Sequence, residues 1–200
     1  MYWFMDSRFD TAYAAAKQVV DGLNYKRGPV DINEVVRVVE GLKNVDIKIL
    51  KDRFEAVDKR FAKCGAAMSI AREKQRECIN SNEYNAVVLL NNAHPYSSMR
   101  FSLAHELGHV MTQIPDEVDT AEGQFVVSMH INTNITSLEI TQESSKYELD
   151  EQIANIFALL VLMPGKVFTA VFDLLQDKKM VAEYFDVEED AVESRLNLER

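Results

Sequence analysis

His105, Glu106 and His109 stand in the spacing His-Glu-x-x-His, within the stretch RFSLAHELGHV at 100–110. On an α-helix, positions four apart lie on one face, so the two imidazoles can bind one metal ion together. Glu106 then lies beside the first imidazole, within reach of a water molecule on that metal. Two histidines and a carboxylate in this pattern supply two metal ligands and a general base, the minimal set of groups for a zinc hydrolase.

The residues around the motif predict a helix with a buried face. Ser102 is placed to cap the start of this helix. Gly108 is a poor helix former, and we interpret it as the point where a neighbouring element comes close to the metal. The alternative is a surface helix with two solvated histidines. Against it stand six apolar residues at helical spacing: Phe101, Leu103, Ala104, Leu107, Val110 and Met111.

A catalytic zinc site needs a third protein ligand and an open position for water. The stretch at 144–164, SSKYELDEQIANIFALLVLMP, predicts a second helix that can supply this ligand. Ser145 and Glu148 have the spacing of a capping box at its start, and Pro164 ends it.

On this second helix, Glu151 and Asn155 share a face because they are four residues apart. We predict that Glu151 is the third ligand, with Asp150 and Glu148 as alternatives. Asn155 can hydrogen-bond to the free ring nitrogen of a ligand histidine and fix its tautomer. Without the first helix, we would interpret Glu151 as a charged residue on the solvent-exposed face of its helix.

Together, the motifs RFSLAHELGHV and ExxANxFAxxxLMP resemble the ImmA/IrrE family of metallo-endopeptidases, between about residue 84 and residue 170. The resemblance implies a gluzincin-like site in which His105, His109 and Glu151 bind Zn²⁺ and Glu106 is the general base. It also implies that the segment at 85–91 is the strand before the active-site helix. A strand beside the cleft can pair with an extended substrate.

Proteins of this family are similar in cutting one specific partner, typically a helix-turn-helix repressor of a prophage, mobile element or stress regulon. The resemblance therefore implies a regulatory zinc endopeptidase with such a repressor as its substrate. In the implied mechanism, Glu106 takes a proton from water as the water attacks a peptide carbonyl. The alternative is a non-catalytic zinc-containing binding module, such as a toxin–antitoxin or phage regulatory component, in which His130 closes the site as a fourth ligand.

The interval between the two motifs is longer than the family resemblance leads us to expect. We interpret 117–147 as an insertion that carries a hairpin of strands at 125–132 and 135–140. A second electrophile can come from any of four residues, which the sequence does not rank: Tyr147, His130, Tyr96 and Arg100.

Composition limits the class of protein. The net charge of −10 and the sequence pI of about 4.9 argue against direct binding to nucleic acid. Two cysteines, Cys64 and Cys78, predict no disulfide framework and a reducing, cytoplasmic compartment. The start of the chain lacks the pattern of a signal peptide, and no stretch is long enough to span a membrane.

The pattern along the chain predicts an α+β fold, in which a small, mostly antiparallel sheet packs on helices that include a zincin-like active-site helix. We expect a metallopeptidase domain at 1–170 and a helical C-terminal appendage at 171–200, which can belong to the same domain. Asp31 is a predicted helix cap. The expected helices are 10–23, 32–42 and 51–63, and the expected strands are 45–50, 66–72, 75–79 and 85–90.

The C-terminal stretch at 181–196 has the apolar spacing of a helix-turn-helix unit. Its second helix opens with Glu188, Glu189 and Asp190, and 174–200 contains eight acidic and four basic residues. Phosphate groups would be repelled by this surface. We therefore interpret it as a helical cap or a protein-docking surface rather than a DNA-binding element.

Overall fold

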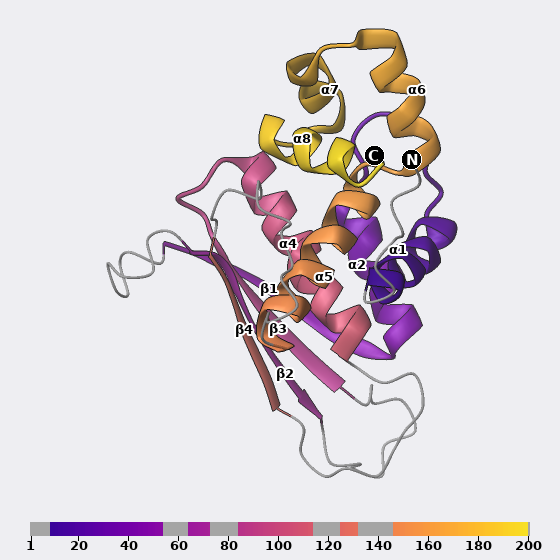
Figure 1. The fold of residues 1–200 in the computed structure, drawn as a ribbon. Helices are drawn as coiled ribbons and strands as arrows, with labels where there is room; N and C mark the ends of the chain where they lie inside the picture. Colours follow the sequence, from indigo (N-terminus) through magenta and orange to yellow (C-terminus); the bar gives the residue numbers. More distant parts are fainter. Residues whose placement is uncertain (1–8, 54–63, 73–83, 114–124, 132–145, 200) are drawn as a thin grey trace.

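The structure, a computed structural model, describes residues 9–53, 64–72, 84–113, 125–131 and 146–199 (Figure 1). These residues form helices and strands in the following order: α1 (Asp10–Gly22), α2 (Ile32–Lys43), β1 (Val45–Asp52), β2 (Cys64–Arg72), β3 (Tyr84–Asn91), α4 (Tyr96–Gln113), β4 (Phe125–Ile131), α5 (Lys146–Leu162), α6 (Gly165–Leu175), α7 (Lys178–Phe185) and α8 (Glu189–Asn197).

The four strands form one sheet in the order β1-β3-β2-β4. β1 pairs with β3 in parallel, whereas β2 pairs with β3 and with β4 in antiparallel orientation. Figure 1 shows the helices gathered on one side of this sheet, with α4 packed against β2 and β3. The predicted α+β class with a mostly antiparallel sheet is therefore confirmed.

Most of the predicted elements that fall on described residues are found. The predicted helix at 51–63 is wrong at its start, because Lys51 and Asp52 continue β1 and pair with Leu90 and Asn91 of β3. Hydrogen bonding to a neighbouring strand thus outweighs the helical spacing of the apolar residues that follow. Residues 54–63 and the predicted strands at 75–79 and 135–140 lie outside the described residues.

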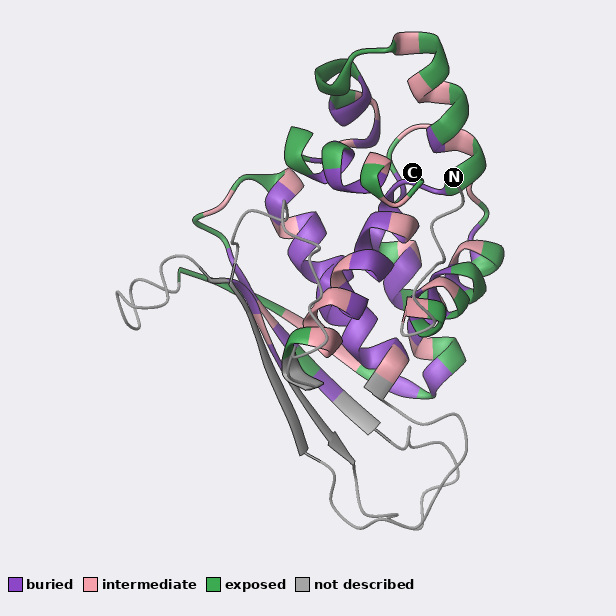
Figure 2. Cartoon of the chain, in the orientation of Figure 1, coloured by how far each residue is buried: buried purple, intermediate pink, exposed green. Residues whose placement is uncertain are grey.

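The helices that carry the two motifs form the centre of the molecule. Figure 2 shows buried residues along most of α4 and α5, and the six apolar residues predicted to face the core are all buried. The same core includes Phe168 of α6, Phe185 of α7 and Val192 of α8. The C-terminal helices therefore share the core of α4 and α5, while the division of the chain into domains stays a prediction.

The C-terminal helices are tied to the first turns of α4 by polar contacts. Arg100 of α4 donates to the carbonyls of Phe185 and Asp186 at 3.0 and 2.7 Å, to the carboxylate of Asp186 at 2.8 Å and to the carbonyl of Val30 at 2.7 Å. Glu188 accepts from the hydroxyls of Ser97 and Ser98. These contacts fix the turn between α7 and α8 against the helix that carries the first motif.

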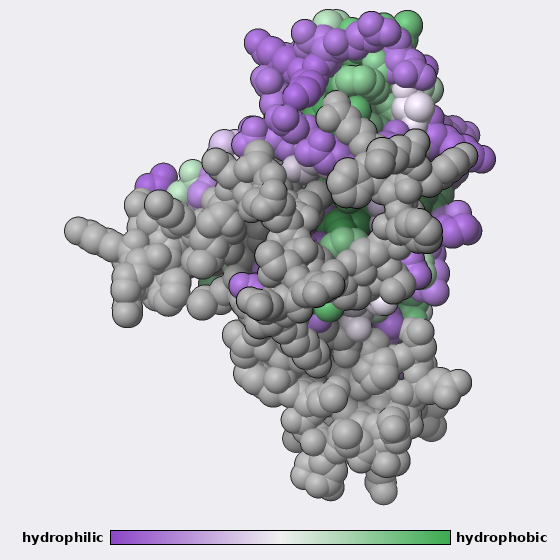
Figure 3. Space-filling view, viewed as in Figure 1, coloured by the Kyte–Doolittle hydropathy of each residue, from purple (hydrophilic) through white to green (hydrophobic). Residues whose placement is uncertain are grey.

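The outer surface of the C-terminal helices is largely hydrophilic in the view of Figure 3, with apolar side chains recessed between the polar ones. In the described part of the chain, no single helix is long and apolar enough to cross a membrane. The helices Glu148–Leu162 and Gly165–Leu175 are bent by 68° relative to each other. They reach the length and apolar composition of a membrane span only when the two are counted as one segment.

Asp31 caps α2, as predicted, because its carboxylate accepts a hydrogen bond from the backbone N–H of Asn33 at 2.9 Å. Replacing Asp31 by alanine leaves this N–H without its partner, so we expect the free energy of unfolding to fall by about 1 kcal/mol. Asp31→Asn keeps an acceptor oxygen and should stay close to wild type. Urea unfolding of the two variants checks this, and equal losses in both would contradict the capping role.

Candidate metal centre

The helix that carries the first motif begins earlier than its sequence pattern predicts. α4 starts at Tyr96, directly after Pro95, whose carbonyl accepts from the backbone N–H of Met99 at 3.0 Å. A proline cannot donate to a preceding turn and is favoured at such a start. Ser102 is therefore not the cap of this helix, and the prediction that it is one is wrong. It lies in the second turn, with 1% of its surface exposed.

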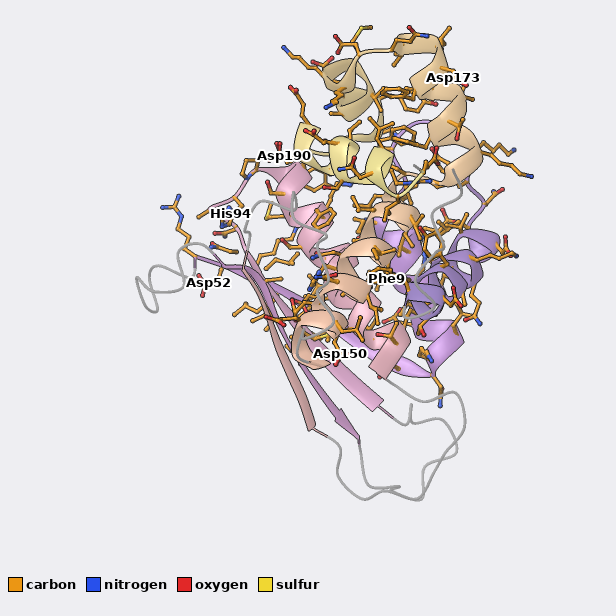
Figure 4. All side chains as sticks on the ribbon, viewed as in Figure 1. Phe9, Asp52, His94, Asp150, Asp173 and Asp190 are labelled. Carbon is orange, nitrogen blue, oxygen red and sulfur yellow. The ribbon has the colours of Figure 1, made fainter. Side chains whose placement is uncertain are left out.

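Three side chains converge where α4 and α5 pack together, a region that Figure 4 draws with its side chains. The Nε2 atoms of His105 and His109 are 3.1 Å apart. The two carboxylate oxygens of Glu151 each lie 3.3 Å from one of these nitrogens. Donor atoms this close together could hold a metal ion, and no other such group occurs among the residues that the structure describes.

The structure brings Glu151, rather than the alternatives Asp150 and Glu148, together with both histidines. Glu148 is exposed in the first turn of α5, and Asp150, labelled in Figure 4, is partly buried near the same end. Asp150, one residue away from Glu151, projects in another direction on the helix, and Glu148 lies one turn earlier, where it is exposed to solvent. The packing of α5 on α4, rather than helical spacing alone, thus selects Glu151 from this acidic stretch.

Asn155 lies one turn beyond Glu151, and its Oδ1 is 2.8 Å from Nδ1 of His105. An amide oxygen can only accept, so Nδ1 of His105 carries the proton and donates it to Asn155. In the neutral ring, Nε2 then carries the lone pair and faces His109 and Glu151, whereas in the protonated ring Nε2 donates to Glu151. The neutral form is the tautomer that a metal ligand needs, and it agrees with the predicted role of Asn155.

We expect Asn155→Ala to weaken binding of a divalent ion such as zinc by about 10- to 100-fold, because the ring of His105 loses the group that orients it. Asn155→Asp keeps an acceptor at the same place and should retain most of the affinity. A competition titration against a chelator measures both variants. Wild-type affinity in Asn155→Ala would show that Asn155 does not orient the ligand.

The close approach of α4 and α5 depends on Gly108, as the sequence predicts. A Cβ atom at this position would lie 3.0 Å from the Cα of Ala154, 3.2 Å from its carbonyl oxygen and 3.1 Å from a ring carbon of Phe157. Backbone atoms cannot move aside as a flexible side chain can, so α5 would have to shift as a whole. Gly108 thereby allows Glu151 to reach the histidines on the facing helix.

We expect Gly108→Ala to lower the free energy of unfolding by about 1–3 kcal/mol through overpacking, and to weaken metal binding as well. Gly41 in α2 is the matched control, because a Cβ there meets nothing within 4 Å. Gly41→Ala should be neutral or stabilising by up to about 1 kcal/mol. Urea unfolding and a metal titration test the pair, and equal behaviour of the two variants would contradict the close-packing account.

The electrostatics of the group favour a cation between its members. Burial alone would raise the pKa of Glu151, but hydrogen bonds from His105 and His109, together with their charges, hold that pKa far below its usual range. For His105, burial alone would lower the pKa. This effect is outweighed by the hydrogen bond to Glu151, the charges of Glu106 and Glu151 and the hydrogen bond to Asn155, so the pKa of His105 is raised. A proton or a metal ion is therefore stabilised at this point.

The centre lies deep in the fold. His105, Glu106 and His109 are almost completely buried, whereas the side chain of Glu151 is 20% exposed. Of the three metal-binding candidates, the carboxylate is thus the one that faces solvent.

The four candidates for a second electrophile are placed differently. Arg100 is engaged by the C-terminal helices and by Val30, so it anchors the fold rather than lining the metal group. Tyr96 is 56% exposed at the first residue of α4. His130 belongs to β4, opposite Ala66 of β2, and Tyr147 belongs to the start of α5. Of the expected insertion at 117–147, the structure describes only β4 and the start of α5.

One implication of the family resemblance is wrong for this chain. The resemblance makes the strand before α4, at 85–91, a candidate for pairing with an extended substrate. It lies inside the sheet as β3, paired with β1 on one side and with β2 on the other over nearly its whole length. Its backbone groups are therefore already engaged by the sheet, and they do not offer an edge to an extended peptide.

No protein-family model matches the chain, and a search among curated proteins finds no match either. The geometry of the three side chains and the sequence pattern around them are therefore the basis for a functional argument.

Proposed function

We propose that this protein is a zinc-dependent endopeptidase, and that it regulates transcription by cleaving a helix-turn-helix repressor. One observation carries the proposal: donor atoms of His105, His109 and Glu151 converge between α4 and α5, and Glu106 follows the first ligand directly in the sequence.

The donor set fits zinc. In a tetrahedral zinc site with bonds of about 2.0–2.1 Å, neighbouring donor atoms lie about 3.3 Å apart. The two Nε2 atoms are 3.1 Å apart, and each of them lies 3.3 Å from a different carboxylate oxygen of Glu151. With one ligand atom per residue, the three atoms lie within 4.8 Å of one another, close enough for one ion to draw them together. Magnesium and calcium prefer oxygen ligands, whereas two imidazole nitrogens with one carboxylate are typical of zinc and related transition metals.

The number of donors supports a catalytic site. Structural zinc sites are usually closed by four protein ligands, whereas catalytic sites have three and an open position. The group in the described part of the chain has three members. The alternative, a binding module that keeps zinc for its structure, requires a fourth protein ligand, for which His130 is the candidate.

The reaction assigned to this site is hydrolysis of a peptide bond. A zinc ion held by His105, His109 and Glu151 would supply a Lewis acid that makes water a stronger nucleophile near neutral pH. Glu106 accepts the proton of the attacking water and delivers it to the leaving amine. Asn155 keeps the ring of His105 in the tautomer whose Nε2 can act as a ligand.

The substrate class follows from the family resemblance and is supported by charge. With a net charge of −10, the chain attracts a basic protein such as a DNA-binding repressor and repels nucleic acid itself. We place this reaction in the cytoplasm, where such a repressor acts and where a chain with only two cysteines needs no disulfide framework.

The proposal is tested by incubating the zinc-loaded protein with candidate helix-turn-helix repressors and following them by mass spectrometry. We expect one repressor to be cut at a defined peptide bond. A chelator should stop the cleavage, and added zinc should restore it. Repressors that all stay intact with fully zinc-loaded protein would contradict the proposal and favour the binding module.

A further inference from the structure

Ser102 is a buried serine whose hydroxyl has no partner in the structure. Its side chain lies within α4 with 1% of the residue exposed, and its Oγ forms no hydrogen bond. Buried polar groups are nearly always paired, because an unpaired one gives up its bonds to water without compensation. Within the same helix, the hydroxyls of Ser98 and Thr112 bond to Glu188 and to the carbonyl of Gly108, at 3.1 and 2.9 Å.

The fold gains nothing from this hydroxyl. Alanine is a better helix former than serine in the interior of a helix, and it would leave no polar atom unpaired. The hydroxyl thus costs stability in the free protein, which is typical of groups that serve a ligand rather than the fold.

The position of Ser102 points to the substrate as that ligand. Residues 102, 105, 106 and 109 are three, four and seven apart, so Ser102 lies on the stripe of α4 that carries His105, Glu106 and His109. It stands one helical turn before Glu106 and is buried to the same depth. A group bound at Glu106 therefore lies one helical turn from Ser102.

We propose that the Ser102 hydroxyl is a substrate-positioning group, which hydrogen-bonds to the peptide backbone of the substrate next to the bond that is cut. The inference rests on the proposed endopeptidase function. Ser102 holds the substrate and takes no part in the proton transfers assigned to Glu106. Both edges of β3 are paired with neighbouring strands, so β3 cannot bind the backbone of the substrate. Polar groups on α4 are then the candidates for this role.

The test uses the full zinc-loaded chain and the peptide hydroxamate acetyl-Leu-Leu-NHOH, whose hydroxamate binds zinc while its backbone occupies the substrate site. Ser102→Ala should keep wild-type zinc affinity and have an unchanged or higher urea midpoint. It should bind the hydroxamate about three- to tenfold more weakly, the effect of one hydrogen bond. Ser102→Thr keeps the hydroxyl and should restore the binding.

Ser98→Ala is the matched control for stability. Its hydroxyl is buried on the same helix but bonds to Glu188, so this variant should have a lower urea midpoint. A lower urea midpoint in Ser102→Ala as well would show that the hydroxyl stabilises the fold, and this result would overturn the proposal. Unchanged hydroxamate affinity in Ser102→Ala would overturn it too. If the wild-type protein itself does not bind the hydroxamate, the endopeptidase proposal fails, and the role of Ser102 fails with it.

Discussion

Replacing Glu106 by glutamine is expected to lower the rate of repressor cleavage by about 10²- to 10⁴-fold, the range for loss of a general acid–base group. Glutamine has nearly the same size and can still form hydrogen bonds, but it cannot take a proton from water. Since Glu106 is not a member of the ligand group, the zinc content and the urea midpoint should stay close to wild type. Initial cleavage rates at matched zinc occupancy measure the effect.

Glu148→Gln is the control for removing a carboxylate from this part of the molecule. Glu148 is exposed in the first turn of α5 and lies outside the ligand group, so its variant should cleave at the wild-type rate. If Glu106→Gln cleaves as fast as wild type, Glu106 is not the general base and the proposed mechanism is wrong.

Replacing Glu151 by alanine is expected to weaken zinc binding by more than the roughly 100-fold loss that follows removal of a group supporting a ligand. The variant loses one of three ligands and leaves two neutral imidazoles to bind the ion. It also loses the one carboxylate of the ligand set. A chelator competition titration, with zinc content measured after dialysis, gives the affinity.

Asp150→Ala is the matched control, since Asp150 is the adjacent carboxylate on the same helix and lies outside the ligand group. It should bind zinc like wild type. The opposite result, in which Asp150→Ala loses zinc and Glu151→Ala keeps it, would show that the third ligand is wrongly assigned.

The main features of the candidate metal centre could be predicted from sequence because they depend on spacing within two helices. Residues four apart share a helical face whatever the surrounding fold, so the pairs His105–His109 and Glu151–Asn155 could be recognised directly. The role of Gly108 could also be inferred, because a glycine inside a helix costs stability unless another element approaches it.

Several features that depend on which elements meet in space could not be predicted from local spacing. The spacing of residues 85–91 indicates a strand, but not that β1 and β2 cover both of its edges. The capping role predicted for Ser102 failed because the helix begins six residues earlier, after Pro95. The bonds from Arg100 to Phe185 and Asp186 join positions 85 and 86 residues apart, which local spacing does not reveal.

The central claim is an open zinc centre with three protein ligands, and a crystal structure of the zinc-loaded protein with anomalous data at the zinc edge tests it most directly. The account predicts one zinc ion bound by Nε2 of His105, Nε2 of His109 and a carboxylate oxygen of Glu151, at about 2.0–2.2 Å, with a water molecule in the fourth position. A zinc ion bound elsewhere, or closed off by a fourth protein ligand such as His130, would contradict it.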